Sequence, residues 1–127
     1  MSLRWSDVFT LVSRRKVGHC LGKTTPADEM TWEGTFEGQN LSVVSTVRLT
    51  CGNMAHFLTH SGARIGTFDW NLVGGHFVDL VVHARRPLDT AQLLSLGQLA
   101  LTEDTRPVFV RRHGEKLEES LNIPRPS

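Results

Sequence analysis

The feature that most constrains this chain is a two-residue periodicity between residues 30 and 84. Apolar and polar side chains alternate there in five runs typical of half-buried strands. These runs are Met30–Glu37, Leu41–Thr50, Asn53–His60, Arg64–Trp70 and His76–Ala84. The joins between them hold two to five residues and are rich in turn formers. Such joins suit antiparallel hairpins and are too short for parallel crossovers, so the pattern predicts an antiparallel meander.

A helix is expected before this region. Apolar side chains recur at helical spacing from Trp5 to Val12, which forms one apolar stripe. The basic run 14–16 suits the last turn of a helix, and Gly18 would end it. The N-terminal segment therefore predicts a helix that packs on the sheet.

A second helix is expected after the meander. Asp89 can cap it, and Gln92 stands three residues on, where it completes a capping box. Leu88 and Leu93 are spaced as a hydrophobic staple. The segment has little polar face up to Leu101, so we expect this helix to be largely buried.

Two shorter elements are expected near the C-terminus. Residues 107–111 have the composition of a sixth strand, and Pro107 at its start indicates an edge position. Gly114–Leu121 is predicted to form a short final helix, because Pro124 and Pro126 would stop it.

The turn geometry also predicts which side chains share a face. A two-residue turn at 51–52 would place Val47 beside His56, and a turn at Gly38 would place Phe36 opposite Val43. One face then carries the core, to which six aromatic side chains should contribute much. They are Trp5, Phe9, Trp32, Phe36, Phe68 and Trp70. The other face, with Asp79 and His83, is expected to be mainly solvated.

These elements predict an α+β fold. We expect a curved antiparallel sheet of five or six strands, with the N-terminal helix and the buried C-terminal-half helix packed on one face. A chain of 127 residues can bury about two-thirds of its surface, which favours a single domain over residues 1–127.

Charge and hydropathy exclude several partner classes. Fourteen basic and thirteen acidic residues leave a net charge of +1, so no bulk field attracts nucleic acid or anionic lipid. No run approaches the roughly 18 apolar residues of a membrane span, so no membrane association is expected. The basic clusters Arg85-Arg86 and Arg111-Arg112-His113 could touch phosphate, but such clusters are more typical of solvated strand ends. Nucleic acid is therefore not an expected partner.

The cysteines and the N-terminus favour a cytoplasmic location. Cys20 and Cys51 could form one disulfide, but free thiols in a reducing compartment fit a chain of this size better. The first seven residues are polar and carry no apolar signal-peptide core.

Two motifs suggest a bound cofactor, and neither satisfies the geometry. His56 and His60 would bind one metal on a helix, but on a strand their Cα atoms lie about 13 Å apart. The glycine-rich run 18–24 lacks one residue of a phosphate loop, and Pro26 interrupts the helix that should follow. No cofactor, metal ligand or catalytic residue is predicted.

Two function classes remain open. The first is a small non-enzymatic binding or interaction module of adaptor, inhibitor or antidote type, which binds a protein partner or self-associates as a homo-oligomer. The alternative is a small-molecule-binding protein or small enzyme, with a pocket between the sheet and the helices. Its predicted ligand-binding residues are His56, Trp70 and His76.

Overall fold

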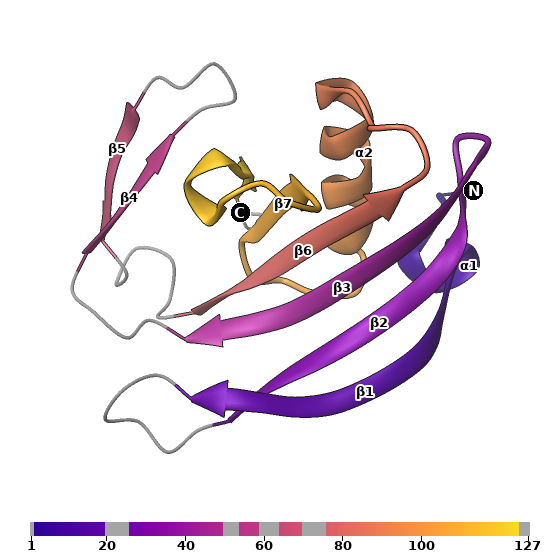
Figure 1. Ribbon diagram of the computed structural model, residues 1–127, viewed down its shortest axis with the longest axis horizontal. Helices are drawn as coiled ribbons and strands as arrows, with labels where there is room; N and C mark the ends of the chain where they lie inside the picture. The colour runs from indigo at the N-terminus through magenta and orange to yellow at the C-terminus, as the bar shows by residue number, and fades with distance from the viewer. Residues whose placement is uncertain (1, 20–25, 50–53, 59–63, 70–75, 125–127) are drawn as a thin grey trace.

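The computed structural model describes residues 2–19, 26–49, 54–58, 64–69 and 76–124. Figure 1 shows an open, curled sheet with one longer helix beside it and a short helix near the N-terminus. Along the chain the elements are α1 (Trp5–Val8), β1 (Phe9–His19), β2 (Pro26–Phe36), β3 (Gln39–Leu49), β4 (Met54–Leu58), β5 (Arg64–Asp69), β6 (His76–Ala84), α2 (Thr90–Ala100), β7 (Val108–Arg112), η1 (Leu117–Glu119) and β8 (Leu121–Ile123).

The larger sheet has six strands in the order β1-β2-β3-β6-β7-β8. Every neighbouring pair in it is antiparallel except β6 and β7, which are parallel. The predicted α+β class, with a mostly antiparallel sheet, an N-terminal helix and a helix in the C-terminal half, is therefore confirmed.

The N-terminal helix is much shorter than predicted. It ends at Val8, and the chain continues as β1, which pairs with β2. β-Branched residues such as Thr10 and Val12 favour an extended chain. Trp5 and Phe9 still meet in the core, with ring centroids 4.2 Å apart, so the apolar stripe reflects a helical turn followed by a strand.

Gly34 of β2 allows the end of α1 to approach this strand closely. A Cβ atom added at Gly34 would lie 2.1 Å from the backbone oxygen of Val8. Any other residue at position 34 would therefore force the two chain segments apart.

The hairpin between β2 and β3 closes on two residues. Glu37 and Gly38 both have positive φ, 49° and 82°, as a type I′ turn requires. Phe36 consequently pairs with Gln39, and Val43 lies opposite Trp32. The predicted pairing of Phe36 with Val43 is wrong, because it assumed a longer turn.

The predicted meander is interrupted after β3. This strand pairs with β6, and Val47 lies opposite Val78. β4 and β5 form a separate two-stranded sheet, in which His56 lies opposite Thr67. The predicted pairing of Val47 with His56 is therefore wrong, and the reason is that β6 offers β3 a row of apolar partners on one face.

A capping box and two buried leucines stabilise the start of α2, which lies on the connection from β6 to β7. Asp89 Oδ1 accepts from the backbone N–H of Gln92 at 2.8 Å, and Gln92 Oε1 accepts from the backbone N–H of Asp89 at 2.9 Å. Leu88 and Leu93 are both buried. The predicted capping box is confirmed. The helix is buried on one side only: its buried residues are Leu93, Leu96, Gly97, Leu99 and Ala100, whereas Leu94 is 41% exposed.

The C-terminal elements differ from the prediction. β7 lies between β6 and β8 rather than at an edge. Pro107 precedes the strand, so its missing N–H removes no bond from the ladder, and its oxygen accepts from the Val78 amide. In place of a final helix the chain forms the 3-10 turn η1 and then β8.

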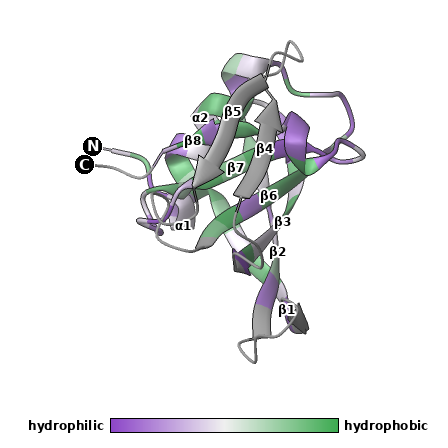
Figure 2. Ribbon diagram, turned by 90° about the vertical axis from the view of Figure 1, so that its left-hand side faces the viewer, coloured by the Kyte–Doolittle hydropathy of each residue, from purple (hydrophilic) through white to green (hydrophobic). Residues whose placement is uncertain are grey.

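The main core lies on the sheet face that α2 covers, and Figure 2 shows hydrophobic residues around α2, β6 and β7. The opposite face is not simply solvated. Phe77, Asp79 and Phe109 are buried there, and the two phenyl rings are 4.6 Å apart. The prediction of a mainly solvated second face is wrong at this point, because an ion-pair cluster and an aromatic pair occupy it.

Candidate functional site

The basic clusters of the sequence meet at one end of the sheet. Because β6 and β7 are parallel, their carboxyl ends lie at the same edge. Arg85 and Arg86 follow β6, while Arg112 ends β7 and His113 follows it. The His113 amide donates to the Val82 oxygen at 2.9 Å, which joins the two ends. Ligands of sheets with parallel strands commonly bind beside such carboxyl ends.

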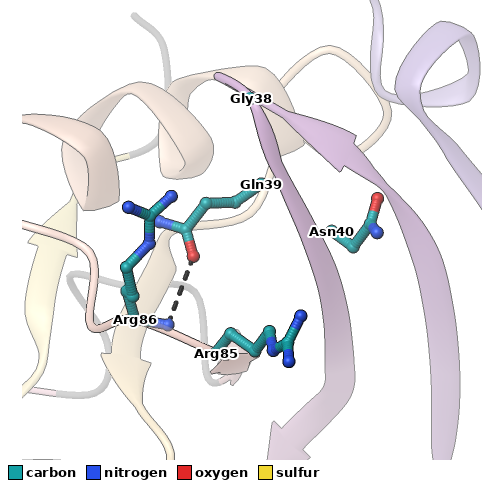
Figure 3. Close-up of a pocket in the computed structure, with 5 residues that line it drawn as sticks. All are labelled: Gly38, Gln39, Asn40, Arg85 and Arg86. Carbon is teal, nitrogen blue, oxygen red and sulfur yellow. Dashed lines mark hydrogen bonds between the residues drawn. The ribbon is translucent and has the colours of Figure 1, made fainter.

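A depression of about 410 Å³ lies at this end of the sheet, beside the β2–β3 turn. It is lined by Gly38, Gln39, Asn40, Arg85 and Arg86 (Figure 3). Gln39 Oε1 accepts from the backbone amide of Arg86 at 3.4 Å, which fixes the amide side chain beside the arginine. Both arginines are exposed, and neither guanidinium is paired with a carboxylate among the described residues.

A wider and shallower depression adjoins the first and shares Asn40 and Arg85 with it. It runs over β1, β2, β3 and β6. The residues are Thr10, Glu33, Gly34, Thr35, Asn40, Leu41, Ser42, His83, Ala84 and Arg85. Acidic Glu33 and basic Arg85 both face it, so the combined surface carries both signs of charge.

Two histidines, one on β6 and one directly after β7, stack on each other at this end of the sheet. The rings of His83 and His113 have centroids 4.1 Å apart, beside a depression of about 160 Å³. Burial lowers the pKa of His83, and the nearby His113 lowers it further. Protonation of His83 is therefore opposed both by desolvation and by a second imidazole.

Arg112 holds this region together rather than facing solvent freely. Its Nε donates to the Leu88 oxygen at 2.6 Å, and its NH1 lies 3.3 Å from Glu115 Oε2. The guanidinium thus ties β7 to the segment that leads into α2, and Glu115 balances its charge. This leaves Arg85 and Arg86 as the available cations at the edge.

A second ionic cluster, which the sequence analysis missed, lies on the face opposite α2. Asp79 Oδ2 accepts from Arg48 Nε at 2.7 Å and from an Arg111 NH2 at 3.0 Å. Asp79 is only 1% exposed. Its Oδ1 and the Nε of Arg111 have no hydrogen-bond partner among the described residues. The alternation along β6 does place Asp79 on this face, but the sequence separates it from Arg48 by 31 residues.

The predicted pocket residues stay a prediction. Trp70 lies outside the described residues. The backbones of His56 and His76 belong to different sheets, in β4 and β6, and their side chains lie outside the described part. His60, Cys20 and Cys51 also lie outside the described residues.

The described residues also bear on metal binding and on membrane spanning. They contain no group of three or more His, Cys, Asp or Glu side chains placed to hold a metal ion. None of the helices formed by these residues is long and apolar enough to cross a membrane.

Comparisons with known proteins identify no relative: no family model, no curated protein and no solved structure matches this chain.

Proposed function

We propose that the protein is a small non-enzymatic binding module that holds an acidic segment of a protein partner at Arg85 and Arg86. The observation that carries the proposal is the depression of Figure 3, in which two exposed guanidinium groups have no carboxylate partner among the described residues. Guanidinium groups bind carboxylates through paired N–H donors, so an Asp or Glu side chain is their natural ligand.

The neighbouring side chains favour a peptide. Gln39 and Asn40 supply amide donors and acceptors beside the arginines, which suits a polypeptide backbone. Glu33 lines the adjoining depression together with Arg85. A carboxylate at this place opposes a dense polyanion such as nucleic acid, whereas a protein segment of mixed charge can match both signs.

The proposal includes a location. A protein partner in the cytoplasm agrees with two cysteines outside any C-x-x-C motif.

The experiment is a binding titration in low salt with a labelled oligoglutamate peptide, and fluorescence anisotropy measures the bound fraction. Replacing both arginines, as in Arg85→Gln/Arg86→Gln, should weaken binding by roughly tenfold and by no more than about thirtyfold, since each of the two exposed ion pairs contributes up to about 1 kcal/mol. Binding should also weaken as salt rises, because the Debye length falls to about 10 Å at 0.1 M.

The matched control is Arg14→Gln/Arg15→Gln, which removes two exposed arginines that are already paired with Asp28 and Glu29. It should leave peptide affinity within about twofold. Equal losses for both double variants would show attraction by net charge alone and would contradict the proposal. Tighter binding of a single-stranded oligonucleotide than of the peptide, lost with the same arginines, would assign the site to nucleic acid instead.

A further inference from the structure

Two side chains of opposite charge line the wider depression, and both are exposed. Glu33 belongs to β2, and Arg85 directly follows β6. Neither side chain forms an ion pair with the other or with any further residue that the structure describes. A surface that holds unpaired charges of both signs is complementary to a partner that also brings both signs.

The strand register sets the distance between these two charges. Glu33 lies opposite Ser42 of β3, and Ser42 lies opposite His83 of β6. Directly opposite residues share a face of the sheet, and Arg85 stands two residues beyond His83. Two strand spacings and two residues along the chain separate the Cα atoms of Glu33 and Arg85 by roughly 12 Å.

This separation matches an extended peptide. Such a chain advances about 13 Å over four residues, and side chains four positions apart point to the same side of it. A segment that places an acidic side chain on Arg85 therefore brings the side chain four positions away to Glu33.

Arg85 connects this path to the narrower depression. Of the two arginines, only Arg85 lines both depressions. In Figure 3 its guanidinium group points away from that of Arg86. A segment held at Arg86 and Arg85 can therefore continue across β3 toward Glu33.

We infer that Glu33 selects the partner segment, which carries an acidic residue on Arg85 and a Lys or Arg four positions away on Glu33. This inference rests on the proposed function and names the charge pattern that the site accepts. Glu33 repels a uniformly acidic segment and stabilises one with a cation at this position, so the same carboxylate provides both the attraction and the repulsion on which specificity depends.

The experiment compares two labelled peptides with blocked ends by fluorescence anisotropy in low salt. The mixed peptide is Lys-Ser-Gly-Ser-Glu-Ser-Gly-Ser-Lys, which presents a lysine four positions from the glutamate in either chain direction. In the acidic peptide glutamate replaces both lysines.

The substitution Glu33→Gln should act on the two peptides in opposite directions. It should weaken the mixed peptide by about twofold to fivefold, because one exposed ion pair is lost. It should strengthen the acidic peptide by a similar factor, because one repulsion is removed. A merely structural role of Glu33 would change both affinities in the same direction and would overturn the inference.

The matched control is Glu118→Gln, which removes an exposed carboxylate of η1 that lines neither depression. It should leave the ratio of the two affinities as in the wild type. Arg85→Gln/Arg86→Gln should weaken both peptides, and if it weakens neither, the proposed function itself is wrong. If it weakens both while Glu33→Gln leaves the ratio of affinities unchanged, only the inference about Glu33 is overturned.

Discussion

Asp79 offers a direct test of how the sheet is held together on the face opposite α2. Its carboxylate is 1% exposed and accepts from Arg48 and Arg111 through the same oxygen. The substitution Asp79→Asn preserves size and shape and removes the charge. The Arg111 side chain, only 15% exposed, would then remain charged in a half-buried place without a counter-ion among the described residues, because a guanidinium does not lose its proton.

The expected loss is large. Removing one partner of a buried ion pair typically costs about 3 to 5 kcal/mol, against a total stability of about 5 to 15 kcal/mol. For 127 residues the entropy of unfolding is about 0.27 kcal/mol/K near 60 °C, so Tm should fall by about 11 to 19 °C.

The assay is urea unfolding of wild type and variants, monitored by circular dichroism, with thermal melts beside it. Arg48→Met should cost no more than about 1 kcal/mol, because Arg48 is 46% exposed. The double variant Asp79→Ala/Arg111→Met removes the buried charges together and should recover much of the loss. If Asp79→Asn unfolds within about 1 kcal/mol of the wild type, the account of this cluster as a buried counter-ion is refuted.

Three further outcomes follow from the structure. Gly97→Ala should lower the unfolding free energy by about 1 kcal/mol despite a better helix propensity, because its Cβ would lie 2.6 Å from Ile123 Cγ1; urea unfolding measures this, and a gain in stability would contradict the packing of α2. Gly34→Ala should cost about 2 kcal/mol or more, since the clash is with the fixed backbone of the first helix; an unchanged Tm would argue against the close approach of α1 and β2. The lowered pKa of His83 means that its folded form resists protonation, so the stability present above its ordinary pKa of 6.5 is lost as pH falls through the lower, folded value. Unfolding measured from about pH 8 to about pH 5 should therefore show a smaller acid loss in His83→Gln than in the wild type, and parallel curves would disprove this contribution.

The sequence predicts the parts of the fold that depend on local signals. The alternating runs 30–37, 41–50 and 76–84 each correspond to a strand. The capping box before α2 also depends on residues three positions apart, so it can be recognised without the fold.

Long-range pairing is what the sequence could not supply. Short joins favour neighbouring hairpins, yet β3 pairs with β6 across the whole β4–β5 segment. The prediction of a longer N-terminal helix was wrong for a different reason. The spacing of four residues between Trp5 and Phe9 fits a continuous helix. It fits equally well the observed structure, in which one helical turn leads into a strand.

The candidate site was visible in the sequence only as two separate basic clusters. What joins them is the parallel pairing of β6 and β7, which brings the two carboxyl ends to one edge. The predicted order of strand, helix and strand over residues 76–112 indicates this parallel pairing, because a crossover helix is the usual link between parallel strands. The role of Arg112 depends on Leu88 and Glu115 and needed the structure.

The central claim is that Arg85 and Arg86 form the binding surface for an acidic protein segment. The most direct test is a nuclear magnetic resonance titration of the ¹⁵N-labelled chain with the oligoglutamate peptide, read at the backbone amides and the arginine Nε–H groups. The largest shifts should lie at residues 37–40 and 83–86, with the Nε–H signals of Arg85 and Arg86 moving together. Shifts centred elsewhere, or spread evenly over all exposed arginines, would contradict it.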